Sequence, residues 1–541
     1  MPVSYICRHM FSVRTLLCLL IIVVFSKEII AGPGNEKEVN QTLLKLRQDV
    51  EYLASADLQG RLTGTDGEQK AATYIESRFR NMGIQPYKNK YQWAFTANVG
   101  TRIGSNAYFS VFNTRLNLNS DLVFLPYSKG NTIFGSVYPK VYEENQVWLV
   151  PMSEARVIET NDFQKRIYDY ARDCMNRKSG AVVFYNDIGT NYDFSPLNLN
   201  QYEALSIPVA IMNHKAYLTH LKANMHKDWI EIDAKLGYEN ANTTGTNVIA
   251  MIDNKAPLTI VIAAHYDHLG EGYPGADDNA SGIAALLQIA EQISSLKLNR
   301  YNFLFAAFSG KEQDHQGSKA FIKQNEHQLN AFAAMIDLDM LGRYNQVSKE
   351  LYIGGGATSP YWIPALQKIN KGYVLKIDSS GTGYSDYSVF YQNNVPAIRL
   401  STGYHNDYMK NTDVATRINY SGLMSVIQYV SSLLTDMNLN SKPVFTKTND
   451  YIPRIESLKT NLGIIPDNSF EQNGIRVGAC LPNKMAEKAG ILNGDIISKI
   501  GEFIIVDMND YIEALTKTDK GKETTIIVKR DKYEFKFFVV L

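Results

Sequence analysis

Between residues 258 and 434, short continuous apolar runs alternate with apolar positions at helical spacing. Four runs predict buried strands, at 258–264, 303–308, 333–338 and 395–400. Two stretches predict helices, at 283–293 and 423–434. Strands that alternate with helices indicate an α/β fold, with a mixed, largely parallel sheet flanked by helices. Ligands bind at the carboxyl ends of the strands in such sheets.

The regions on either side have different patterns. Residues 36–82 show helical spacing, interrupted by a glycine-rich loop in which Thr65 or Asp66 can cap the second helix. Residues 116–236 instead carry short apolar runs between Asn-rich turns, and two of these runs, at 181–185 and 207–212, predict buried strands. The chain has 541 residues, too many for one ordinary domain, so we expect several units.

The N-terminus has the features of a secretory signal peptide. Arg8 and Arg14 precede the apolar run 16–25, and the small residues Ala31 and Gly32 follow it. The run is too short to span a bilayer comfortably, since a spanning helix needs about 20 residues. We therefore expect a secreted or periplasmic (cell-envelope) protein with no integral membrane span after signal removal. An uncleaved anchor is the alternative.

Charge and cysteine content narrow the classes of partner. Fifty-five basic residues balance fifty-five acidic ones, so no electrostatic field favours nucleic acid. Outside the signal segment the chain has only Cys174 and Cys480, which are far apart in sequence, and no disulfide framework is visible.

Histidine and carboxylate residues follow three of the predicted strands. His265 and Asp267 end the first strand, Lys311 and Glu312 follow the second, and Asp339 follows the third. Asp278 lies in the glycine-bounded turn that opens the helix after the first strand. A single such residue is usually a solvated loop residue or a helix cap. Several of them at one sheet edge indicate a zinc site instead.

These motifs resemble metallopeptidase family twenty-eight, which includes bacterial leucyl aminopeptidases and glutamate carboxypeptidases. The resemblance covers the His-x-Asp strand end, the Asp-Asn-Ala-Ser-Gly turn and the Leu-Asp-Met strand, and runs from about residue 43 to residue 434. It implies an α/β zinc aminopeptidase fold with two zinc ions bridged by one aspartate, and a glutamate as general base. Carried over by position, the resemblance implies that His265, Asp278 and Asp339 bind the first zinc ion, with Asp278 as the bridging aspartate. It implies that Glu312 binds the second zinc ion and that the carboxylate of Asp267 supports His265.

Two positions depart from the family pattern. Lys311 stands where the family carries the general-base glutamate, and Met409 stands where it carries the last histidine ligand. A general base must accept a proton, whereas a lysine ammonium only donates. A thioether suits copper(I) better than zinc. We therefore expect Lys311 to lie near the second-metal position, paired with Asp278 and Glu312, so that the site binds one zinc ion weakly, or none.

Two further segments resemble known modules. The segment at 119–240, inserted into the zinc-peptidase domain, resembles a protease-associated domain. The C-terminal segment at 455–541 resembles a bacterial PDZ domain, in which Leu462, Gly463 and Ile464 are the candidate carboxylate-binding loop. The expected organisation has five parts: a signal peptide at 1–31, a zinc-peptidase domain at 36–118 and 241–437, the insert at 119–240, a linker at 438–454 and the PDZ domain at 455–541.

Two functions follow from these residues. The chain is either a secreted pseudopeptidase that binds peptides or protein termini, or an active metallo-aminopeptidase with an altered metal site. Lys311 and Met409 favour the first. Asp314, His315 and His405 are the residues nearest in sequence that could replace the missing groups.

Overall fold

The computed structural model describes residues 33–118, 120–125, 132–138, 141–155, 163–189, 205–235, 238–448, 460–470, 472–482, 484–519 and 521–541. The predicted signal peptide and most of the second half of the predicted linker lie outside these residues. The chain divides into two compact units, one made of residues 1–97 and 244–541 and the other of residues 98–243.

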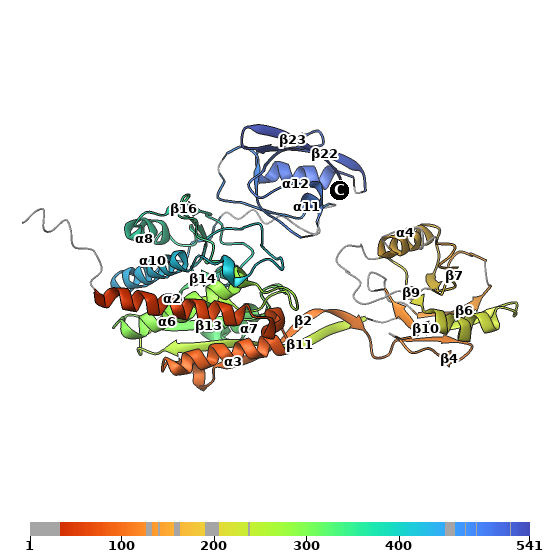
Figure 1. The fold of residues 1–541 in the computed structure, drawn as a ribbon, viewed down its shortest axis with the longest axis horizontal. Coiled ribbons are helices and arrows are strands. Elements are labelled where there is room, and N and C mark those ends of the chain that lie inside the picture. The colour runs from red at the N-terminus through yellow and green to blue at the C-terminus, as the bar shows by residue number, and fades with distance from the viewer. Residues whose placement is uncertain are drawn as a thin grey trace, which may run out of the picture. The chain divides into compact units, whose positions relative to one another are not determined.

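A nine-stranded mixed sheet forms the centre of the first unit (Figure 1). Its main path has the order β1-β11-β13-β12-β14-β17-β15-β16, and β2 pairs with β11. The strands are β1 (Gln85–Pro86), β2 (Gln92–Ile103), β11 (Tyr238–Ile252), β12 (Thr259–His265), β13 (Asn302–Phe308), β14 (Phe332–Leu338), β15 (Glu350–Gly354), β16 (Val374–Ile377) and β17 (Ala397–Ser401). Strands β13, β12, β14 and β17 are parallel neighbours. Their carboxyl ends therefore meet at one edge.

Helices cover both faces of this sheet. On β12, Ile260 and Ile262 face one apolar core and Val261 and Ala263 face the other, as the alternation of side chains along a strand requires. Five helices pack in the first core: α2 (Pro33–Leu53), α3 (Asp66–Asn81), α6 (Gly282–Ser295), α8 (Trp362–Ile369) and α10 (Tyr420–Leu439). Two pack in the second: α7 (Gln316–Gln324) and α9 (Tyr387–Gln392). The α/β prediction is confirmed for this part of the chain.

The predicted elements match the structure within a few residues, but the sequence pattern did not predict β1, β2, β11, β15, β16, α7, α8 or α9. All four predicted strands and both predicted helices are present, and Thr65 rather than Asp66 caps α3, accepting a hydrogen bond from the Glu68 amide. The sequence did not indicate β15 and β16, because their apolar runs are short and only partly buried. Helix α10 ends at Leu439, within two residues of the start of the predicted linker.

The second unit contains two four-stranded sheets, with orders β4-β3-β10-β6 and β5-β9-β8-β7. Its elements are β3 (Tyr108–Val111), β4 (Thr114–Arg115), β5 (Leu122–Phe124), β6 (Thr132–Val137), β7 (Val147–Pro151), α4 (Phe163–Asn176), β8 (Ala181–Tyr185), β9 (Val209–Met212), α5 (His214–Ala216) and β10 (Ile230–Lys235). The predicted buried strands at 181–185 and 207–212 correspond to β8 and β9. The β-rich character of the insert was therefore read correctly.

Residues 460–541 form a β-rich fold with two helices. Its main sheet path has the order β18-β19-β20-β22-β23, and β21 pairs with β20. The elements are β18 (Ile464–Pro466), β19 (Ile475–Cys480), α11 (Met485–Ala489), β20 (Ile496–Ile500), β21 (Phe503–Ile504), α12 (Met508–Lys517), β22 (Glu523–Arg530) and β23 (Tyr533–Val540). We call these residues the C-terminal domain. Among the described helices, none has the length and apolar character needed to cross a membrane.

Candidate metal centre

The predicted metal-binding residues meet at the carboxyl edge of the central sheet. His265 is the last residue of β12, Glu312 follows β13, and Asp339 follows β14. Asp278 lies in the buried turn Ala276–Ser281 that opens α6. Because these strands are parallel neighbours, their ends bring residues from distant parts of the sequence together.

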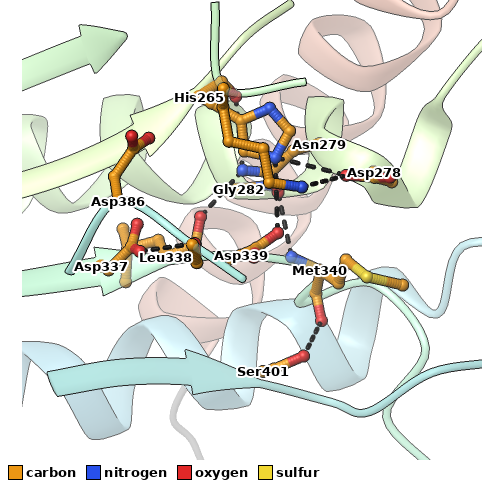
Figure 2. A network of polar contacts seen from close by, with 12 residues as sticks. His265, Asp278, Asn279, Gly282, Asp337, Leu338, Asp339, Met340, Asp386 and Ser401 are labelled. Atoms are coloured by element: carbon orange, nitrogen blue, oxygen red, sulfur yellow. Dashed lines mark hydrogen bonds and ion pairs between the residues drawn. The ribbon is translucent and has the colours of Figure 1, made fainter. Parts of the chain in front are cut away.

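Three ligand atoms converge at this edge. His265 Nε2 lies 3.2 Å from Asp278 Oδ1 and 3.4 Å from Asp339 Oδ1. All three side chains are almost fully buried, and within the described residues none of these atoms has a hydrogen-bond partner. Figure 2 shows the three side chains turned towards one another. Burial and the Lys311 charge lower the pKa of His265, but the surrounding carboxylates outweigh them and raise it well above the ordinary value.

Asp267 lies next to His265, on the Nδ1 side of its ring. Its carboxylate accepts hydrogen bonds from the Lys311 and Glu312 amides, each at 3.1 Å, and its Oδ1 lies 3.6 Å from His265 Nδ1. Burial raises the pKa of Asp267, but His265 and the two amides lower it below the usual value. The hydrogen bond at His265 Nδ1 is formed with the backbone carbonyl of Asp267, at 3.2 Å, and it fixes the orientation of the imidazole ring.

The Lys311 ammonium lies among the same carboxylates. Its Nζ is 3.0 Å from Glu312 Oε1 and 3.7 Å from Asp278 Oδ1. Burial lowers the pKa of Lys311, but Asp278 and Glu312 raise it well above the ordinary value. Burial raises the pKa of Glu312 to about 7, although Lys311 opposes that shift. The lysine is therefore a fixed cation, as the sequence suggested, and it lies between the two carboxylates expected to hold the second metal.

Arg399 is a second cation at the centre, and sequence reasoning missed it. Its Nε donates to Asp339 Oδ2 at 2.9 Å, and its side chain is only 16% exposed. Burial raises the pKa of Asp339, but Arg399, Lys311 and His265 lower it well below the usual value. The available signal was a single charged residue inside the otherwise apolar strand 395–400. Its contact with Asp339 depends on the pairing of β17 with β14.

Comparisons with known proteins identify the family of this chain. The profile of Peptidase family M28 matches residues 247–434. The probable leucine aminopeptidase 2 of Arthroderma benhamiae is 31% identical over 361 residues, which are 64% of this chain and 69% of that protein. The chain belongs to peptidase family M28. Its match to another protein, the alkaline phosphatase isozyme conversion protein of Escherichia coli, is 30% identical but spans only 42% of that protein and 26% of this chain.

A solved structure covers much of the same region. The aminopeptidase from an Aneurinibacillus species aligns with 76% of this chain and 96% of its own, with a TM-score of 0.45 and 19% sequence identity.

The first metal position of the M28 family fits a zinc ion in this chain. Ligands bound to tetrahedral zinc at about 2.0–2.1 Å lie about 3.4 Å from one another. The separations from His265 Nε2 to Asp278 Oδ1 and Asp339 Oδ1 have this size, and the three atoms are buried and lack hydrogen-bond partners among the described residues. His265, Asp278 and Asp339 would hold the metal there.

The second metal position does not fit. Ligand atoms of His265, Asp278 and Glu312 do lie within 4.8 Å of one another, which is the spacing of a possible metal site. However, Lys311 Nζ lies within 4 Å of Asp278 and Glu312. An ammonium at this position repels a dication. Met409, which the family resemblance places among the ligands, instead packs against an apolar cluster containing Met340 and Tyr408.

The residues considered as replacements have other partners. Asp314 is 84% exposed and pairs with Lys319, and His315 Nδ1 lies 3.5 Å from Asp386 Oδ1. His405 Nε2 lies 3.1 Å from Asp277 Oδ2, beside the turn that carries Asp278. None of these contacts is with His265, Asp278 or Asp339.

The candidate peptide-binding loop of the C-terminal domain has much of its backbone already bonded. The Gly463 amide donates to Asn461 Oδ1, the Leu462 carbonyl accepts from the Ala486 amide, and the Gly463 carbonyl accepts from Leu481. Ile464 begins β18 and pairs with Cys480. Peptide binding by this loop stays a prediction.

Proposed function

We propose that this chain is an exported M28-family protein that holds at most one zinc ion and binds peptides without hydrolysing them. The observation that carries the proposal is the position of Lys311, whose ammonium lies 3.0 Å from Glu312 and 3.7 Å from Asp278. The same substitution removes the general base and places a positive charge at the second metal position.

The remaining residues support binding. A zinc ion held by His265, Asp278 and Asp339 would act as a Lewis acid towards a peptide carbonyl. Lys311 can donate hydrogen bonds but cannot accept a proton in its charged form. A peptide at this edge would therefore be bound and oriented by this chain's residues, while Lys311 occupies the position from which the family's glutamate takes up the proton.

The second candidate function is an active aminopeptidase with an altered metal site. The intact trio of His265, Asp278 and Asp339 favours it. Relatives such as aminopeptidase Y of Saccharomyces cerevisiae, 27% identical over 227 residues, are named for this activity. For either function, we propose that the chain is exported. We also propose that the insert is a protease-associated domain and that the C-terminal domain is a PDZ domain.

Zinc content and hydrolysis, measured on the same protein, test the proposal. Elemental analysis of the unmodified chain should give at most one zinc, and a panel of aminoacyl anilides should show almost no turnover. The double variant Lys311→Glu with Met409→His should hold two zinc ions and recover hydrolysis. Two zinc ions with substantial turnover in the unmodified chain would establish the second candidate instead.

A matched variant separates metal binding from proton transfer. Lys311→Gln with Met409→His removes the ammonium and restores the histidine but supplies no base. It should hold two zinc ions and turn over about 10²–10⁴-fold more slowly than the Glu variant, which is the usual contribution of a general base. Equal rates in the two double variants would show that another residue is the base.

A further inference from the structure

The C-terminal domain packs against the segment that carries Met409. Met340 and Tyr408 form one buried apolar cluster with Ile465 of β18 and Ala479 of β19. Tyr404, Met409 and Leu481 are partly buried against the same cluster. Met409 therefore contributes apolar surface to a contact with the C-terminal domain, at the position where the family resemblance implies a zinc ligand.

Polar contacts flank this apolar cluster. Lys410 Nζ lies 2.7 Å from Glu487 Oε1 of α11, and Asn468 Nδ2 donates to Asp378 Oδ2 at 3.3 Å. Each pair joins the C-terminal domain to the part of the chain that carries the centre. The approach is close, because a Cβ atom added at Gly478 would lie 3.3 Å from the Tyr404 ring.

The same contact encloses a cavity of about 390 Å³. Tyr352, Tyr404 and Arg399 line it on one side, and Pro466 and Arg476 line it on the other. Arg399 also donates to Asp339, so the cavity reaches the candidate centre through this side chain. The C-terminal domain thus forms one wall of a cavity whose opposite wall includes Arg399, a partner of Asp339.

We propose that the C-terminal domain is a built-in cover of the centre and that Met409 is one of its docking residues. Burying an apolar side chain stabilises a contact by about 1.5–3 kcal/mol, and a thioether adapts to irregular surfaces. The replacement of the family's histidine therefore has a physical role that is separate from metal binding.

Zero-length carbodiimide cross-linking of the full chain tests the cover. The reagent joins a lysine amine to a carboxylate in direct contact, so peptide mapping of the monomer band should recover Lys410 linked to Glu487. Lys45 and Glu291 lie 2.5 Å apart between α2 and α6 and provide the internal positive control. Recovery of the Lys45–Glu291 product without the Lys410–Glu487 product would overturn the proposal.

Two variants on opposite sides of the contact keep the test independent of misfolding. Ile465→Glu and Met409→Glu each place a charge in the apolar cluster, and each should lower the Lys410–Glu487 yield about tenfold, a change of about 1.4 kcal/mol. Ile504→Glu is the control, because this side chain of the C-terminal domain is 70% exposed. Unchanged yields in both cluster variants would overturn the proposal, whatever the zinc content or hydrolytic activity of the chain.

Discussion

The two metal positions of this chain carry opposite chemistry within one cluster of carboxylates. At the first, Asp278 Oδ1 and Asp339 Oδ1 lie 3.2 and 3.4 Å from His265 Nε2, and all three side chains are buried. At the second, the Lys311 ammonium lies beside Glu312 and the same Asp278. Asp278 belongs to both positions, so the substitution at Lys311 changes the electrostatics of the whole centre. Four predictions test this difference, from the largest expected effect to the smallest.

Replacing Asp278 should have the largest effect on stability. Asp278→Asn leaves the buried Lys311 with one carboxylate partner, and breaking a buried ion pair costs about 3–5 kcal/mol. Urea unfolding of the variant and the unmodified chain measures this difference in free energy. Asp314→Asn is the matched control, because Asp314 is 84% exposed, and it should change stability by less than about 0.5 kcal/mol. Similar losses in the two variants would contradict the role given to Asp278.

Removing the second cation should make the chain dependent on zinc. Arg399→Met leaves the carboxylate of Asp339 buried without its closest partner, at a cost of about 3 kcal/mol. A zinc ion next to Asp339 would restore the missing positive charge. Thermal unfolding in EDTA and in zinc should therefore give a larger difference in Tm for this variant than for the unmodified chain. Equal differences would show that Arg399 does not act on the metal position.

The supporting carboxylate should influence zinc affinity. Asp267→Asn keeps the shape of the side chain but removes the charge that faces His265. Zinc affinity should fall about 10–100-fold, as is usual when a carboxylate behind a ligating histidine is lost. Competition with a chromophoric chelator measures this affinity. An unchanged affinity would show that the Asp267 charge does not act on the metal position.

The smallest expected effect is on zinc stoichiometry in a single variant. Met409→His alone should not add a second zinc ion, because Lys311 still lies between Asp278 and Glu312. Elemental analysis after exposure to excess zinc checks this. A second zinc ion in the single variant would show that methionine, and not the ammonium, prevents binding.

The sequence predicted the parts of the centre that depend on local pattern. Apolar runs located β12, β13 and β14, and the residues directly after them identified His265 and Asp339. The position of Lys311 beside Asp278 was instead implied by the family resemblance, which places Lys311 at the general-base position.

Contacts that depend on tertiary structure could not be predicted in this way. Arg399 meets Asp339 only because β17 lies beside β14, and strand order does not follow from the hydrophobic pattern. The sequence also marked Met409 as a lost ligand without indicating its apolar contacts. Those contacts involve the C-terminal domain, which the residue pattern defined only as a separate unit.

Zinc anomalous diffraction from crystals of the unmodified chain grown with excess zinc tests the central claim most directly. We expect at most one anomalous peak, located among His265, Asp278 and Asp339, with Lys311 still in contact with Glu312. Two fully occupied peaks, the second between Asp278 and Glu312 with the lysine displaced, would contradict it.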